Sequence, residues 1–355
     1  MLFVSGCGAG VTVRPVPPAD REMTIAVLPV QNLSEADAPL NQIRRLMLAE
    51  LERRHFHVLP DAALNKFMAR HRMRFTGGVS REISEAFKKE TGAGSVLVTD
   101  VEAYKRRSPP KIALFSRLVK VGGPRPRILW MDSAAMAGND SPGLLGTGLI
   151  SSSRVLVDRE VKKLSASLCA ALDGKKTRHP DVTMSGRFKP IDPFISPLLK
   201  SGRKYRVLVV PFFNISGVEN TGQIMQLQFV NQFMRYPSHF EVIEPGLVRH
   251  EFLNDRIIQW DGISLFNAKL LFTLLNADLI VTGKVLDYQD GGGDPLVNIE
   301  VIALERKSRR VVWSSIGYAH GGDGVYFFDT GKVNTAHDIA SEMARWVAKD
   351  MAEAR

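Results

Sequence analysis

The chain has 355 residues, of which 45% are hydrophobic and 24% are charged, a composition that is typical of a globular protein of about two domains and excludes a disordered or fibrous chain. Lysine and arginine number 47 against 37 for aspartate and glutamate, so the net charge of +10 favours contact with polyanions such as nucleic acid, anionic lipid headgroups or acidic glycans. No stretch reaches the roughly 20 consecutive apolar residues that a membrane-spanning helix needs.

The N-terminal residues carry a possible lipidation signal. Val4, Ser5 and Gly6 precede Cys7, and this order resembles a bacterial lipobox, in which the thiol receives a diacylglycerol. Only six residues precede Cys7 and none is basic, whereas an export signal has a basic segment and about 7–15 apolar residues. Either the start codon is placed too far downstream, or the cysteine occurs by chance. In the first case we expect lipid on Cys7, and Gly8 in place of an aspartate favours the outer membrane.

The first domain is expected over residues 23–173, after a lipobox remnant and tether at 1–22 whose stretch 11–21 is rich in proline and predicted to be unstructured. An apolar, β-branched run at 24–30 predicts a buried strand, and an amphipathic helix is predicted at 41–54. The remaining predicted elements are a strand at 56–60, a helix pair whose second member Ser80 can cap, a strand at 95–104, a hairpin of strands at 111–121 and 126–138, and a helix at 151–172.

Residues 174–204 are rich in proline, glycine and basic residues and predict a linker that packs partly across one domain. The second domain is expected over 205–355, with the same order of elements. Its predicted elements are strands at 205–213 and 240–245, helices at 222–236 and 335–353, a helix pair with Ser264 as a cap, a strand at 279–288, and a hairpin of strands at 295–304 and 310–321.

An internal repeat relates the two domains. Pro29 and Asn32 match Pro211 and Asn214 at a spacing of 182 residues, and Trp130 matches Trp313 at a spacing of 183. These matches keep their order along the chain, and the spacing changes by no more than two residues. A tandem duplication is therefore predicted, in the α/β (α+β) class, with two repeated domains that each form a mixed sheet of about five strands with helices packed on it.

The repeated motifs resemble a known family. A strand ending in VLPVQN (27–32) or VVPFFN (209–214), the strand ADLIVTGKV (277–285) and RRVVW (309–313) are similar to periplasmic lipoprotein domains of the CsgG/TolB amino-terminal type. The first copy departs from the pattern, because Asp100 stands in the place of Lys284. The resemblance implies a non-catalytic protein without cofactors that binds envelope protein partners or copies of itself at the inner leaflet of the outer membrane.

Several local patterns contain residue types that could form sites. His55 and His57 form an H-x-H pair, for which a surface strand edge is favoured over a metal site. His320 and Asp323 are interpreted as a turn that closes a strand. The glycines at 143–148 predict the approach to a helix rather than a phosphate loop. No catalytic, cofactor-binding or metal-binding residue is therefore assigned, and buried packing is expected for Cys169.

Three functions remain open at this stage. The favoured one is a lipid-anchored periplasmic scaffold that binds proteins. The second is a basic module for anionic glycan or nucleic acid, whose affinity would fall steeply with salt, although nucleic acid is the less favoured partner. The third is an enzyme whose site assembles from scattered residues between the copies, and a close cluster of histidine and carboxylate groups there would be its sign.

Overall fold

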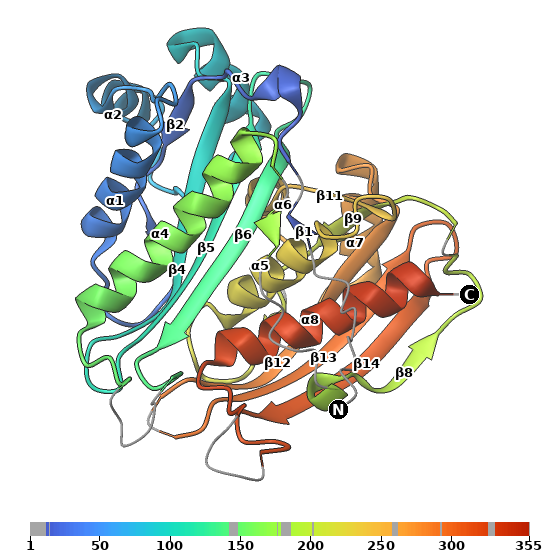
Figure 1. Cartoon of the computed structure of the whole chain (residues 1–355). Coiled ribbons are helices and arrows are strands. Elements are labelled where there is room, and N and C mark those ends of the chain that lie inside the picture. Colours follow the sequence, from blue (N-terminus) through green and yellow to red (C-terminus); the bar gives the residue numbers. More distant parts are fainter. Residues whose placement is uncertain are drawn as a thin grey trace, which may run out of the picture.

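The structure, a computed structural model, describes residues 12–13, 15–141, 148–175, 177–178, 186–200, 202–257, 262–291, 293–325 and 331–354. Cys7 lies outside the described residues, so its lipidation stays a prediction. The same holds for five of the six positions in the glycine-rich stretch 143–148. The folded body consists of two halves with matching orders of helices and strands (Figure 1).

The first half forms a five-stranded sheet, here called the first sheet. Its elements are β2 (Ile25–Val27), β3 (Gln31–Asn32), α1 (Leu40–Arg53), α2 (Asp61–Arg70), α3 (Arg81–Thr91), β4 (Ser95–Lys105), β5 (Lys111–Lys120), β6 (Arg127–Ala137) and α4 (Ser153–Leu172). Strands β4, β5 and β6 form an antiparallel meander, and β2 and β3 run parallel to β4. Helices α1 and α4 cover one face, while α2 and α3 cover part of the other.

The second half forms a seven-stranded sheet, the second sheet, in the order β11-β9-β12-β13-β14-β8 with β10 beside β12. Its elements are β8 (Ile191–Ile195), β9 (Tyr205–Val209), β10 (Phe213–Asn214), α5 (Thr221–Phe233), β11 (Phe240–Val242), α6 (Pro245–Asn254), α7 (Leu265–Leu274), β12 (Leu279–Gln289), β13 (Leu296–Glu305), β14 (Val311–His320) and α8 (Ala336–Glu353). Two repeated α/β units with mixed sheets are thus confirmed.

The duplication extends to single hydrogen bonds. The side chain of Asn32 accepts a hydrogen bond from the Ser34 amide and donates one to the Ala36 carbonyl. In the second half, the side chain of Asn214 accepts from the Ser216 amide and donates to the Val218 carbonyl. Arg44 on α1 donates to the carbonyl of Val27, while Gln226 on α5, 182 residues later, donates to that of Val209.

Two repeated contacts at the helix ends follow the sequence predictions. Ser80 accepts a hydrogen bond from the Ile83 amide, and Ser264 accepts one from the Asn267 amide, so both caps are confirmed. Gly92, at a φ of 72°, ends α3 in the left-handed region that glycine tolerates.

Three segments differ from the expected elements. The stretch predicted as a strand at 56–60 makes only one bridge, between Val58 and Ile25. The linker supplies β8, which pairs antiparallel with β14 at the edge of the second sheet. Val16 lies fully buried in the first core and Asp20 binds Lys120, so this part of the predicted tether packs on the first half. The short strands β1 (Thr12–Val13) and β7 (Thr177–Arg178) pair with each other, and 3-10 turns lie at Pro18–Asp20 and Gly186–Phe188.

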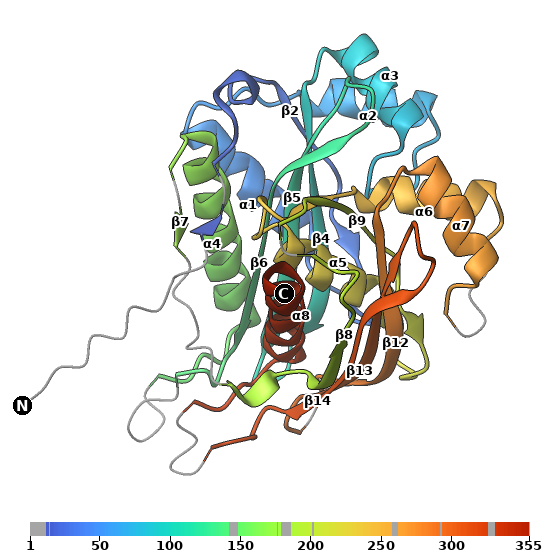
Figure 2. The ribbon, with the colours of Figure 1, turned by 90° about the vertical axis from the view of Figure 1, so that its right-hand side faces the viewer.

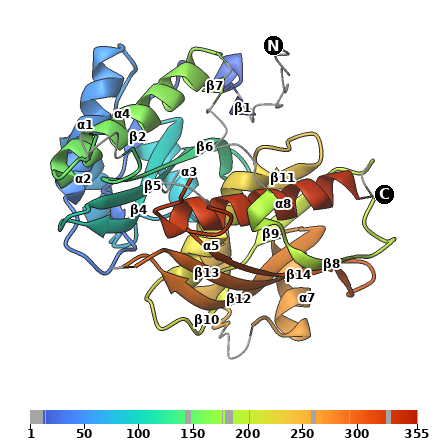
Figure 3. The same ribbon diagram turned by 60° about the horizontal axis from the view of Figure 1, so that its bottom comes forward.

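The halves stack as four layers: α1 and α4, the first sheet, α5 and α8, and the second sheet (Figures 2 and 3). Helices α5 and α8 therefore lie between the two sheets. Leu33, Phe115 and Met131 of the first half belong to the same apolar core as the second sheet. Because α5 contacts sheets on both sides, twelve of its thirteen residues are buried. Two of these, Gln228 and Asn231, carry side-chain amides that donate to the first half.

Candidate functional site

The face of the first sheet that meets the second half carries buried charged side chains. Apolar residues occupy the part of this face under α2 and α3, whereas Asp100, Glu102 and Arg117 occupy the part under the second half. Burying a charge is costly unless it is paired. Each of these groups is paired, and Glu102 and Arg117 have partners in the other repeat.

The first cluster is built around Glu102 on β4. The Nδ1 atom of His337, in the first turn of α8, lies 2.5 Å from Oε2 of Glu102. Tyr288 on β12 donates its hydroxyl to Oε1 of the same carboxylate. The side-chain amide of Gln228 on α5 adds a donor at 3.3 Å. Three side chains of the second repeat thus converge on one buried carboxylate of the first.

Burial and the neighbouring carboxylate act in opposite directions on His337. Burial lowers its pKa, but the Glu102 carboxylate outweighs burial, and the net pKa is raised above 6.5. The pKa of Tyr288 is raised well above 10 by burial and by Glu102, which keeps the phenol protonated as a donor. The Glu102 carboxylate is therefore surrounded by side chains that can donate hydrogen bonds to it.

Ser133 on β6 completes an arrangement that resembles a hydrolytic triad. The Nε2 atom of His337 lies 3.1 Å from Ser133 Oγ, while Nδ1 faces Glu102. The side-chain amide of Asn231 also donates to Ser133 Oγ, at 3.1 Å. The Glu102 carboxylate favours the protonated form of His337, and in that form Nε2 donates to the serine instead of accepting its proton. The arrangement binds the halves together through Ser133.

The second cluster is centred on Arg117, which is fully buried on β5. Its guanidinium donates to Asp100 at 2.9 Å, to the carbonyl of Gly77 at 2.6 Å and to Glu244 of the second half at 3.3 Å. Glu244 also caps α6 through the amides of Gly246 and Leu247. Burial raises the pKa of Asp100 to about 6 although Arg117 acts in the opposite direction. One arginine therefore joins two carboxylates from different repeats.

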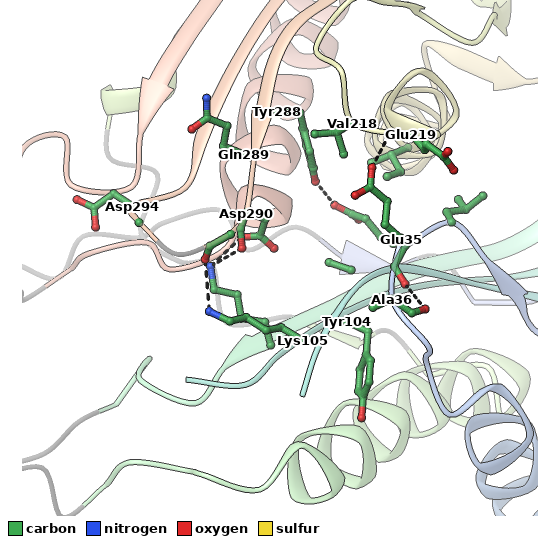
Figure 4. A pocket seen from close by; sticks show the side chains of 18 residues that line it. Glu35, Ala36, Tyr104, Lys105, Val218, Glu219, Tyr288, Gln289, Asp290 and Asp294 are labelled. Atoms are coloured by element: carbon green, nitrogen blue, oxygen red, sulfur yellow. Dashed lines mark hydrogen bonds and ion pairs between the residues drawn. The ribbon is translucent and has the colours of Figure 1, made fainter. Parts of the chain in front are cut away.

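A cavity of about 570 Å³ opens beside the first cluster, where loops of both halves meet (Figure 4). Glu102 and Tyr288 line it, together with the ion pair of Lys111 and Asp290, whose Nζ and Oδ1 atoms lie 2.9 Å apart. Its volume is in the range of small-molecule sites. The described residues that line it include Glu102 but neither Ser133 nor His337.

The residues weighed from the sequence lie elsewhere. His55 and His57 are both exposed at the surface, outside any strand. The backbone amide of His320 donates to Asp323, and the amide of Ala137 donates to Asp140 in the same way, so the prediction of a turn at 320–323 is confirmed. Among the described residues, no group of three or more histidine, cysteine, aspartate or glutamate side chains could hold a metal ion.

Cys169 is buried on α4 in the first core, as expected, and burial raises the pKa of its thiol to about 11. Within the described part of the chain, no helix is both long and apolar enough to cross a membrane.

Sequence reasoning missed Glu102, Ser133 and His337. They are separated by up to 235 residues, and no spacing joins them. The available signal was the repeat itself, because Glu102 and Ser133 are polar where the second copy carries the apolar residues Leu286 and Ile316. A polar residue on the inner face of a strand in one copy alone indicates a contact that the other copy lacks.

No family model matches the chain, and no curated protein matches it. Solved structures do match. They include a PelC dodecamer from Paraburkholderia phytofirmans, 17% identical with a TM-score of 0.32, over 46% of this chain and 96% of that one. The lipoprotein GNA1162 from Neisseria meningitidis is 21% identical with a TM-score of 0.30, over 41% of this chain and 99% of that one. The LpoB C-terminal domain from Salmonella enterica is 18% identical with a TM-score of 0.27, over 32% and 82%. Each match spans less than half of this chain.

Proposed function

We propose that the chain is a non-catalytic scaffold of the bacterial envelope, held at the periplasmic inner leaflet of the outer membrane by lipid on Cys7. The observation that carries the proposal is the joint between the repeats. Its buried charged groups bind one another, with Glu102 held by three side chains and Arg117 held between two carboxylates. Groups that are paired in this way fix the two halves in one arrangement and are not free to act on a substrate.

The proposed anchor would keep the folded body close to the membrane. Val16 is buried in the first half, and its amide donates to the carbonyl of Ala171. Eight residues lie between Cys7 and Val16, so nine residue-to-residue steps join the two. A fully extended chain spans at most about 3.6 Å per residue, so the body would lie within about 30 Å of the lipid. Such a short tether suits a platform for envelope proteins that themselves lie at the membrane.

Lipid labelling in bacterial cells tests the anchor. The natural gene, with its upstream sequence, is expressed with labelled palmitate, and the membrane and soluble fractions are compared. We expect label on the wild-type protein in the outer-membrane fraction and loss of both label and membrane association in Cys7→Ser. The matched control is Cys169→Ala, which should keep the label because Cys169 is buried on α4. An unlabelled wild-type protein in the cytosol would refute the anchored scaffold.

A further inference from the structure

Each repeat has one sheet face that lies opposite its long helices, and this face is covered differently in the two repeats. In the first repeat, the second half covers the sheet face that lies opposite α1 and α4. In the second repeat, the described residues cover the face opposite α5 and α8 only in part, with α6 and α7. Ile316, Tyr318 and Phe194 project from the uncovered part and are 48%, 49% and 52% exposed. Gly317, between the first two, faces Met343 of α8, which confirms that Ile316 and Tyr318 point away from the helices.

Equivalent residues show that this surface corresponds to the buried joint. The amide of Leu33 donates to the Val101 carbonyl, and the amide of Ile215, 182 residues later, donates to that of Val285. Leu33 is 2% exposed because it packs against the second half, whereas Ile215 is 54% exposed. An apolar side chain at a docking position is thus present in both repeats but covered in only one.

The helix layer shows the matching change. In the joint, Gln228 and Asn231 of α5 donate to Glu102 and Ser133. The spacing of 182 residues, fixed by the paired bonds of Arg44 and Gln226, places Leu46 and Ala49 of α1 at the corresponding positions. Leu46 is half-buried and Ala49 is exposed. Polar residues inside the joint therefore correspond to apolar residues on the outer side of α1.

Residue pairs that touch in the joint correspond to matched residue pairs on the two outer surfaces. The polar pair Ser133 and Asn231 corresponds to the apolar pair Ile316 and Ala49. The contact of the Phe115 and His337 rings, 5.2 Å apart, corresponds to Glu300 and Arg154, which carry opposite charges. Glu300 is identified by the register, because Phe115 pairs with Ser133 as Glu300 pairs with Ile316. The two outer surfaces are thus complementary to each other in polarity and charge.

We propose that the uncovered face of the second sheet binds the α1–α4 layer of a second copy of this chain, in the arrangement that joins the two halves. Such a contact uses different surfaces on the two partners, so it is heterologous and continues head to tail. The proposal deepens the scaffold function by naming a second copy as one partner. The test of this contact needs no membrane, so a negative result would not bear on the lipid anchor.

Complementary variants of the full chain test the contact by sedimentation velocity. Ile316→Asp blocks the sheet face, and Ala49→Glu blocks the helix face. We expect wild type to assemble with rising concentration and each variant alone to stay monomeric. An equimolar mixture should form heterodimers, because each variant keeps the surface that the other lacks. Leu253→Asp, a change at a 59% exposed residue of α6, should assemble as wild type does.

Three outcomes would overturn the proposal: a monomeric wild type at every concentration, a single variant that still assembles, or a mixture that stays monomeric while circular dichroism shows both variants folded. An exchange of the charges at Glu300 and Arg154 tests the register of the contact. Glu300→Arg and Arg154→Glu should each weaken assembly, and the double variant should regain it. Failure of the double variant to regain any assembly would exclude the proposed register.

Discussion

At the scale of single residues, the joint depends on charges that cannot be left alone. Arg117 is fully buried and holds Asp100 and Glu244, so its removal would leave two buried carboxylates without their cationic partner, and Glu244 would keep only its hydrogen bonds to the α6 amides. Removing one member of a buried pair typically costs 3–5 kcal/mol, because the remaining charge stays desolvated. The loss of stability on removing Arg117 therefore comes mainly from the carboxylates that stay buried without it, and less from the attraction within the ion pairs.

We therefore expect Arg117→Met to lower the free energy of unfolding by about 3–5 kcal/mol at neutral pH. Chemical denaturation followed by circular dichroism measures this. Arg45→Met, on the exposed side of α1, is the matched control and should change stability by no more than about 0.5 kcal/mol. Equal effects of the two substitutions would show that the Arg117 cluster does not hold the halves together.

His337 predicts a pH dependence. Because Glu102 raises its folded-state pKa above 6.5, the protonated histidine stabilises the fold fully below that pH. This contribution is lost as the pH rises through the folded-state pKa. The stability difference between wild type and His337→Gln should therefore be larger at pH 6 than at pH 9, as measured by denaturant unfolding at both values. A difference that does not vary with pH would contradict the charged pair.

At the scale of the elements, the repeated helices begin at the same residue type. Ser80 and Ser264 each accept the amide three residues ahead. Replacing such a cap by alanine typically costs about 1 kcal/mol. Thermal unfolding of Ser80→Ala and Ser264→Ala should show losses of this size, whereas Ser151→Ala, at an exposed residue just before α4, should show none. A loss in only one of the two cap variants would mean that the caps are not energetically equivalent.

Much of the element order could be predicted, because hydrophobic periodicity and the caps are local signals. Strand β8 could not, because its five exposed residues include Pro193 and carry no alternation. The short strand at 56–60 was overpredicted, since only Val58 reaches β2. The cluster around Glu102 could not be predicted either. Its members lie on β4, β6, β12, α5 and α8, and only the packing of the two repeats brings them together.

At the scale of the whole molecule, the two halves share one core. Leu33, Phe115 and Met131 of the first repeat belong to the apolar cluster of the second sheet. Neither half can therefore unfold without exposing part of the other. Scanning calorimetry should show a single transition, whose calorimetric and van't Hoff enthalpies agree. Two resolved transitions would indicate halves that are stable independently of the joint.

The proposed function requires that the residues between the repeats join them and perform no chemistry. The direct test is intact-mass spectrometry after incubation with a fluorophosphonate, which modifies activated serines. The account predicts unmodified protein, because Glu102 favours the protonated form of His337, which donates to Ser133 instead of accepting its proton. An adduct on Ser133 that disappears in a folded His337→Gln variant would contradict the account and identify an active site in its place.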